Sequence, residues 1–238
     1  MAQAGSPETD SKSPPKNAKQ SHPRLALLLF LLSLLVYLST RFVRLPDFPI
    51  YFFTDEAIQS QHAVDLINNG FRSPDGVLLP TYFENGGQFN LSLSVYAQVI
   101  PMLVFGKSVW ITRGVSVLLT LAAAISLGLI LRNTFKNRYW WLGTLLLAAT
   151  PTWFLHSRTA FETVIMTSML AGFLFFYLRY RDGHPRALLL ALLFGALAFY
   201  AYSPGQVIIV FAGLLLLMAD VKYHWHTRKM AVIGLGLW

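Results

Sequence analysis

The chain has 238 residues, of which 55% are hydrophobic and only 13% are charged, whereas soluble domains carry about 25% charged residues. Its net charge of +8 comes from short basic clusters between apolar runs, which is the positive-inside pattern of membrane proteins and not a nucleic-acid-binding stripe. The absence of cysteine excludes disulfides and thiolate metal sites. We therefore predict an all-α integral membrane protein with no nucleic-acid partner, and we assign it no metal site and no cofactor.

The N-terminal residues differ in composition from the rest of the chain. Residues 1–23 are rich in Ser, Pro, Lys and Gln and show no apolar periodicity, which predicts a disordered cytoplasmic tail. Residues 24–238 are expected to be the N-terminal part of one multi-span helical domain, truncated because the apolar run that opens at Ala231 does not finish. Six spans are expected, roughly over residues 24–45, 110–131, 139–156, 161–178, 187–203 and 205–219.

The apolar segment Leu91–Phe105 decides the predicted topology. It is short for a ~30 Å hydrocarbon core and contains Pro101. If this segment does not span the membrane, most Lys and Arg residues fall on the same side as the N-terminus, whereas a span here would move the later basic clusters to the other side. We therefore expect a juxtamembrane helix within an outer loop over residues 46–109, in the plasma (inner) membrane of a cell, with the N-terminus in the cytoplasm.

The outer loop becomes acidic just after the first span. A helix is expected over Thr54–Asn68, with Thr54 as its cap and with Asp55 and Glu56 in its first turn. Carboxylates at this position complement the helix dipole, so a purely structural role would explain the pair. At 100° per residue, Asp55 and His62 share one face and Glu56 points elsewhere.

The turn after the third predicted span emerges on the same outer side. It carries Arg158 and Glu162, which stand four residues apart and could pair on a helix. One role for such a pair is to close a helix end, but charges at the lip of a span usually face protein or water-filled space. Arg113 and the pair Tyr200 and Tyr202 reach the same side. The outer side thus collects the carboxylates, cations and aromatics that a sugar transfer from a lipid phosphate requires.

Several short motifs stand in a characteristic order along the chain. They are Asp55-Glu56-Ala57, Phe105-Gly106 followed by Arg113, then Pro151, Ser157-Arg158-Thr159-Ala160-Phe161-Glu162 and Tyr200-Ala201-Tyr202. Together they resemble the C-type (GT-C) membrane glycosyltransferases of the protein mannosyltransferase kind, family 39, and most closely the bacterial branch. The resemblance implies a multi-span helical bundle and an inverting glycosyltransferase that uses a polyprenyl-phosphate sugar on the outer face of the membrane.

The resemblance also implies roles for individual residues. It makes Asp55 the catalytic carboxylate and Glu162 the second acidic residue of the site, with Glu56 as a further catalytic candidate. The substrate-binding candidates are Arg158, Arg113, His62, Tyr200 and Tyr202. Relatives often carry a lysine before the juxtamembrane helix, where this chain has Asn85 and Asn90, so the donor phosphate is expected to depend on Arg158, Arg113 or residues beyond Trp238. The implied partners are the polyprenyl-phosphate sugar donor, a glycan, lipid or protein acceptor, and the lipid bilayer.

Two other classes of protein stay open at this point. One is a transporter or flippase whose charges line a path, and the other is a non-catalytic membrane partner with a charged outer vestibule. The carboxylates lie in a loop and at a span lip rather than near the midplane, and no inverted repeat is evident, which disfavours a transporter. Removal of Asp55 separates an enzyme, which loses turnover, from a partner, which does not.

Overall fold

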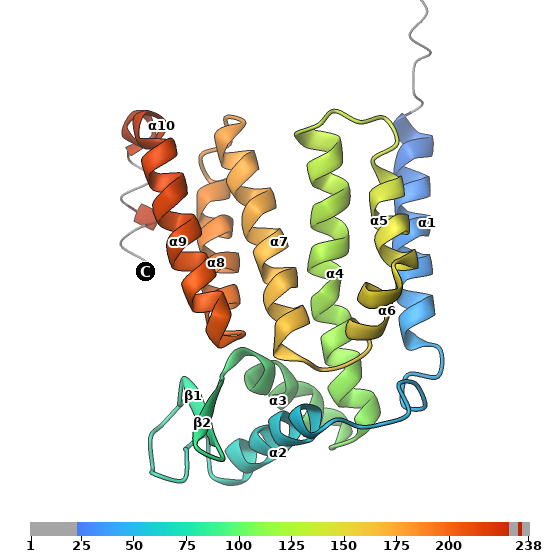
Figure 1. The fold of residues 1–238 in the computed structure, drawn as a ribbon, viewed down its shortest axis with the longest axis vertical. Helices are drawn as coiled ribbons and strands as arrows, with labels where there is room; N and C mark the ends of the chain where they lie inside the picture. The colour runs from blue at the N-terminus through green and yellow to red at the C-terminus, as the bar shows by residue number, and fades with distance from the viewer. Residues whose placement is uncertain (1–22, 229–232, 235–238) are drawn as a thin grey trace, which may run out of the picture.

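The computed structural model describes residues 23–228 and 233–234. Three of its helices are long and apolar enough to cross a membrane, namely α1 (Pro23–Phe42), α4 (Val109–Asn133) and α7 (Glu162–Arg181). They run side by side in a helical bundle (Figure 1), which confirms the predicted fold class. The predicted tail lies outside the described residues apart from Pro23, which begins α1, and the apolar run from Ala231 lies largely outside them as well.

The other described helices of the bundle are shorter than these three. They are α5 (Trp141–Ala149), α6 (Pro151–His156), α8 (Ala187–Phe199), α9 (Ser203–Ala219) and α10 (Val221–His226). The predicted span over 139–156 is broken between α5 and α6, where Thr150 has an extended backbone with φ −67° and ψ 117°. The break follows from Pro151, because a proline disfavours the helical conformation of the residue before it and has no N–H to donate.

The direction of the helices sorts the connecting loops to two ends of the bundle. In Figure 1, α1, α5–α6 and α8 run toward the end that carries α2 (Thr54–Asn68) and α3 (Leu93–Phe105), and α4, α7 and α9 run away from it. The turn before α7 and the turn before α9 therefore lie at the α2/α3 end, as the charge distribution predicts. That this end faces the outside stays a prediction.

Helices α2 and α3 lie across the end of the bundle instead of along it (Figure 1). Their shared core contains Ala63 and Leu66 from α2 and Val95 and Val99 from α3. With 13 residues, α3 is about 20 Å long, too short for a ~30 Å hydrocarbon core. It therefore has the form of the predicted juxtamembrane helix.

A two-stranded hairpin, which the sequence analysis did not predict, leads into α3. Strand β1 (Tyr82–Asn85) pairs with β2 (Gln88–Leu91) in antiparallel register, with Asn85 opposite Gln88. The two-residue turn needs a positive φ at both central positions, and Gly86 and Gly87 supply it with φ of 54° and 84°. After the hairpin, the backbone N–H of Leu93 donates to the carbonyl oxygen of Tyr200 at 3.0 Å. This bond ties α3 to the turn between α8 and α9.

Small residues allow the long helices to approach one another closely, as is usual in membrane bundles. Gly172 of α7 lies against the ring of Phe194 in α8, and Gly128 of α4 lies against Phe30 of α1. Neither position has room for a Cβ unless its neighbour shifts. These contacts fix the bundle that carries the α2/α3 end.

Candidate functional site

An ion pair between Glu56 of α2 and Arg113 of α4 lies at the centre of the α2/α3 end, and both side chains are fully buried. Arg113 Nε and Nη2 donate to Glu56 Oε1 and Oε2, each at 3.0 Å. The same carboxylate accepts hydrogen bonds from the backbone N–H groups of Phe53 at 3.1 Å and Ala160 at 3.0 Å. Four hydrogen bonds thus surround Glu56, and they join the start of α2, the start of α4 and the turn before α7.

Arg113 also holds the linker between α1 and α2. Its Nη1 donates to the carbonyl oxygens of Leu45 at 3.1 Å and Pro49 at 2.9 Å, and its Nη2 donates to that of Tyr51 at 2.7 Å. With the two bonds to Glu56, all five N–H donors of the guanidinium group are engaged. Arg113 therefore has no donor left for a substrate in this conformation.

Arg158, from the turn before α7, is buried against the end of α1. Its guanidinium group donates at 2.7–3.0 Å to the carbonyl oxygens of Thr40, Arg41, Val43, Arg44 and Phe48. The last carbonyl groups of a helix have no partner within the helix and carry the negative end of its dipole, so a buried cation at this position is well placed. Here too, all five donors are engaged by the protein.

The predicted pairing of Arg158 with Glu162 is wrong. Among the described residues Glu162 has no ion-pair partner, and Arg158 turns toward α1 instead. The cluster of α1 carbonyl groups offers Arg158 a full set of acceptors, which a single carboxylate at the start of α7 does not.

A third arginine, Arg41, completes this region. Its Nε donates to Ser157 Oγ at 3.1 Å, its Nη1 donates to the carbonyl oxygen of Ala148 at 3.0 Å, and its guanidinium group stacks 4.0 Å from the ring centre of Tyr37. We call Arg41, Arg113, Arg158 and Glu56 the buried arginine layer. Since it holds three guanidinium groups and one carboxylate, the layer carries an excess of positive charge.

The carboxylates of Asp55 and Glu162 lie beside this layer and are much less constrained. Asp55 is exposed, and in the part of the chain that the structure describes it makes no hydrogen bond and no ion pair. Glu162 is half-buried at the first position of α7, and its Oε1 has no hydrogen-bond partner. The Glu162 carboxyl group interacts electrostatically with Asp55, and it has a hydrogen bond with the backbone of Leu91. The fold thus brings Asp55 and Glu162 together, as the sequence analysis expected.

The orientation of α2 differs from the prediction. Its buried face is formed by Glu56, Gln59, Ser60, Ala63 and Leu66. Glu56 therefore points into the protein, whereas Asp55 points to its surface; the two lie on different faces as expected, but the sequence did not predict that the face of Glu56 is the buried one. The N-cap is also displaced from Thr54 to Phe53, because the Glu56 carboxylate takes the backbone N–H of Phe53.

The family comparison assigns the chain to a known class of enzyme. Residues 93–238 match the family model described as dolichyl-phosphate-mannose-protein mannosyltransferase. The chain belongs to this family. No curated protein and no solved structure matches it. Family membership confirms the predicted class, a multi-pass membrane glycosyltransferase that depends on a lipid-phosphate sugar, over a transporter or a non-catalytic partner.

The match to this mannosyltransferase family includes only part of the candidate site. Arg113, Arg158 and Glu162 lie within the matched residues, and so do both tyrosines of the turn between α8 and α9. Tyr200 is 40% exposed and Tyr202 is half-buried, and both lie at the α2/α3 end. Asp55, in contrast, precedes the matched residues, so the evidence for its role is structural.

His62 belongs to a separate part of the α2/α3 end. It lies about 10 Å along α2 from Asp55 and stacks on Phe83 of the hairpin, with 5.2 Å between ring centres. Burial lowers the pKa of its imidazole, and the nearby charge of Asp65 opposes this effect only in part. His62 lines a cavity of about 280 Å³ between α2 and the hairpin, together with Asp65, Arg72, Tyr82 and Phe89.

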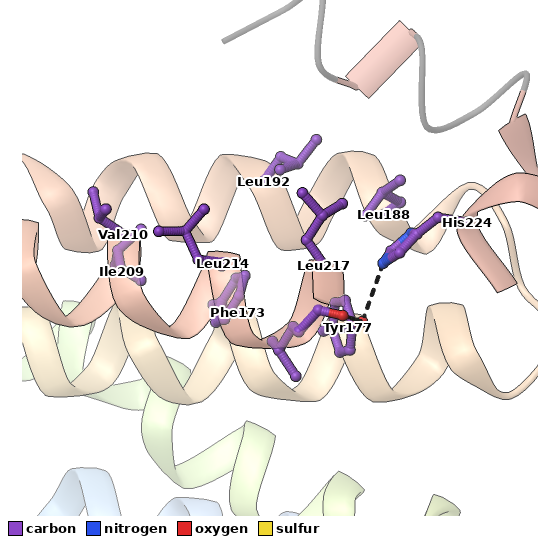
Figure 2. A pocket seen from close by; sticks show the side chains of 11 residues that line it. Phe173, Tyr177, Leu188, Leu192, Ile209, Val210, Leu214, Leu217 and His224 are labelled. Atoms are coloured by element: carbon purple, nitrogen blue, oxygen red, sulfur yellow. Dashed lines mark hydrogen bonds between the residues drawn. The ribbon is translucent and has the colours of Figure 1, made fainter. Parts of the chain in front are cut away.

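A different cavity lies within the bundle and carries no acidic group. It has a volume of about 280 Å³ and is lined by apolar residues of α7, α8 and α9, including Phe173, Leu188, Ile209 and Leu214 (Figure 2). Its polar part is confined to one end, where Tyr177 Oη lies 3.4 Å from Nε2 of His224. The described residues also contain no group of three or more acidic or histidine side chains placed to hold a metal ion. The candidate catalytic and substrate-binding side chains of this mannosyltransferase-family chain thus lie at the α2/α3 end.

Proposed function

We propose that the α2/α3 end transfers a sugar from a polyprenyl-phosphate donor to an acceptor hydroxyl group at the outer face of the membrane, with Asp55 as the general base. The observation that carries this proposal is the state of the Asp55 carboxylate, which is exposed, unpaired among the described residues and adjacent to Glu162. Glu56, the neighbouring carboxylate, already accepts four hydrogen bonds within the protein. Of the two, only Asp55 is free to accept a proton from a substrate.

The proposed reaction is a single displacement. The Asp55 carboxylate accepts the proton of the acceptor hydroxyl group as its oxygen forms a bond to C1 of the sugar. The bond between C1 and the phosphate oxygen breaks at the same time, and its electron pair leaves with the lipid phosphate. Because the acceptor enters opposite the leaving phosphate, the configuration at C1 is inverted. Glu162 accepts a hydrogen bond from the acceptor or the sugar and holds it toward Asp55.

The departing phosphate needs positive charge, but Arg113 and Arg158 do not supply it by contact. Every N–H donor of both guanidinium groups is bonded within the protein, so the assignment of these residues as direct phosphate ligands is replaced by a positioning role. They hold the linker that leads into α2, where Asp55 is the second residue. Their charge also acts at a distance, since the buried arginine layer has a net positive charge and the field of buried charges is only weakly screened.

Aromatic side chains near Asp55 suit the sugar and the lipid. Tyr51 and Phe53, four and two residues before Asp55, are 75% and 39% exposed, and Tyr200 and Tyr202 contribute further rings from the turn before α9. Aromatic rings with one polar edge bind sugars and occupy the boundary between lipid and water. The family description names mannose, so polyprenyl-phosphate mannose is the first donor to test.

The test is the Asp55→Asn substitution in the full-length protein, in membranes. It keeps the shape of the side chain and removes its basicity, so turnover should fall by about 10²–10⁴-fold while donor binding and thermal stability stay unchanged. Asp47→Asn is the matched control, because Asp47 is an exposed carboxylate of the same linker that pairs with Arg44. A rate within tenfold of wild type for Asp55→Asn would overturn the proposal, and a product with the anomeric configuration of the donor would overturn the inversion.

A further inference from the structure

At the end of the bundle opposite α2 and α3, a cavity of about 270 Å³ is lined by basic residues. Its walls come from the start of α1, the end of α4 and the loop between α4 and α5. They include Pro23, Ala26, Arg132, Lys136, Arg138 and Trp140. Three cationic side chains thus surround one small cavity, far from the carboxylates of the proposed reaction.

Among the described residues, no carboxylate pairs with these cations. The sequences of α1, α4, α5 and the loop over residues 134–140 contain no Asp or Glu. Arg132 lies 5.0 Å from the ring centre of Trp140, and Arg138 contacts Tyr139. Lys136 makes no hydrogen bond and no ion pair within the described part of the chain.

Two other basic residues at the same end of the bundle are paired. Arg179 pairs with Asp182 at 2.9 Å, and Arg181 pairs with Asp220 at 3.0 Å. Like charges gathered around a cavity repel one another unless an anion lies between them. The contrast with Arg179 and Arg181 indicates that the cavity beside α1 suits an anion that the described residues do not supply.

The backbone of the loop holds the cations in place. Lys136 has a φ of 51°, in the left-handed region that a lysine rarely adopts. The backbone N–H of Asn137 donates to the carbonyl oxygen of Leu131 at 3.0 Å, and its side-chain Oδ1 accepts from the N–H of Tyr139 at 2.8 Å. Unfavourable backbone conformations of this kind persist where the surrounding structure imposes them, often at binding sites.

We propose that this cavity binds the phosphate headgroup of an anionic phospholipid. The walls continue into lipid-facing surface, because Leu25 and Leu28 of α1, which are 53% and 63% exposed, lie next to Ala26 and can pack against acyl chains. Trp140 and Tyr139 are aromatic residues of the kind that lie at the boundary between membrane and water. Basic pockets at the ends of membrane helices bind anionic headgroups through the same combination of groups. A free phosphate ion would use the cations but not the adjoining leucines.

Such a lipid would join the start of α1 to the end of α4, which are distant in the sequence. Its negative charge would reduce the repulsion among the three cations and stabilise the two helices against each other. This inference is independent of the proposed transfer reaction, which takes place at the opposite end of the bundle.

The experiment uses the full-length protein, stripped of lipid in detergent. Bound lipid is measured by native mass spectrometry with phosphatidylglycerol, with phosphatidylcholine and with inorganic phosphate. Phosphatidylglycerol should bind in preference to the other two. Each of Lys136→Gln and Arg138→Gln should weaken its binding by about fivefold, as expected for one basic residue near an anionic membrane surface. Arg186→Gln and Lys222→Gln, which remove exposed cations of the same end outside the cavity, should leave binding unchanged.

A second variant separates binding from folding. Lys136→Gly removes the charge but suits the positive φ, so the lipid-free protein should be at least as stable as wild type while phosphatidylglycerol binding still falls about fivefold. Equal binding of phosphatidylglycerol and phosphatidylcholine would overturn the proposal, as would equal losses from the control substitutions. Binding of inorganic phosphate as tight as that of phosphatidylglycerol would overturn its assignment to a lipid.

Discussion

The α2/α3 end contains two polar regions that lie side by side and differ in almost every physical respect. The buried arginine layer consists of Arg41, Arg113, Arg158 and Glu56, whose side chains are enclosed and hydrogen-bonded within the protein. The acidic rim, which we define as Asp55 and Glu162, is exposed or half-buried and largely without partners. The layer joins α1, α2, α4 and the turn before α7, whereas the rim, within the described part of the chain, makes only a backbone hydrogen bond between Glu162 and Leu91.

The two regions meet at consecutive residues of one helix. Successive residues of an α-helix are 100° apart, so Glu56 points into the layer while Asp55 remains at the surface. A buried carboxylate that accepts four hydrogen bonds has a structural role, because its four donors would lose their acceptor if the carboxylate were removed. An exposed carboxylate can accept a proton without unfolding its surroundings. The contrast therefore favours a structural role for Glu56 and the proposed catalytic role for Asp55.

The largest expected effect comes from breaking the layer. Arg113→Met would leave the Glu56 carboxylate buried without a cation and release the carbonyl groups of the linker. Breaking a buried pair in this way costs about 3–5 kcal/mol, so the free energy of unfolding, measured by denaturant titration in detergent, should fall by that amount. Arg44→Met is the control, because Arg44 forms an exposed pair with Asp47 that contributes about 0–1 kcal/mol. Equal losses from the two substitutions would show that the layer is not a distinct structural unit.

A smaller effect is expected at the rim, and in activity instead of stability. Glu162→Gln should lower kcat/KM by about 10–100-fold, which corresponds to one hydrogen bond between substrate and a charged group. Stability should change little, because Glu162 Oε1 has no hydrogen-bond partner and an amide oxygen can still accept the hydrogen bond from the backbone of Leu91. The exposed Glu84 of the hairpin provides the control, and Glu84→Gln should keep the wild-type rate. An unchanged rate in Glu162→Gln would limit the rim to Asp55 alone.

The smallest effect concerns His62, which belongs to neither region. Burial lowers its pKa in the folded protein, so below the ordinary histidine pKa of about 6.5 the unfolded chain binds a proton more readily than the folded one. Its contribution to stability is therefore present above about pH 6.5 and is lost as the pH falls. His62→Gln should reduce the drop in Tm between about pH 7.5 and about pH 5.5. His226→Gln, at the other end of the bundle, should leave that drop unchanged, and an unchanged drop in His62→Gln itself would contradict the prediction.

The arrangement of the bundle could be predicted from the sequence because it depends on charge and length. Basic clusters between apolar runs predict on which side of the bundle each loop lies, and the shortness of Leu91–Phe105 excludes a span there. The proximity of Asp55 and Glu162 followed from the same topology. The hairpin was missed although Asn85-Gly86-Gly87 is a strong turn signal, because the segment was considered only as a connection to the juxtamembrane helix.

The buried arginine layer could not be predicted, because its contacts join distant parts of the chain. The apolar residues of α2 are spread around the helix, so its sequence does not show which face turns inward; Arg113, contributed by α4, decides it. For Arg158, the short-range rule favoured Glu162, but the helix end of α1 offered five carbonyl groups. That helix end comes close to Arg158 only in the folded bundle.

The central claim is that Asp55 and Glu56 have opposite roles, and their matched amide substitutions test it in one assay. The free energy of unfolding should stay within about 0.5 kcal/mol of wild type in Asp55→Asn, as for an ordinary surface substitution, and fall by about 3–5 kcal/mol in Glu56→Gln. The loss in Glu56→Gln is expected because an amide in place of the carboxylate leaves Arg113 without its counter-charge and presents N–H groups to other donors. Equal stability of the two variants, or a larger loss in Asp55→Asn, would contradict the division between a structural layer and a chemical rim.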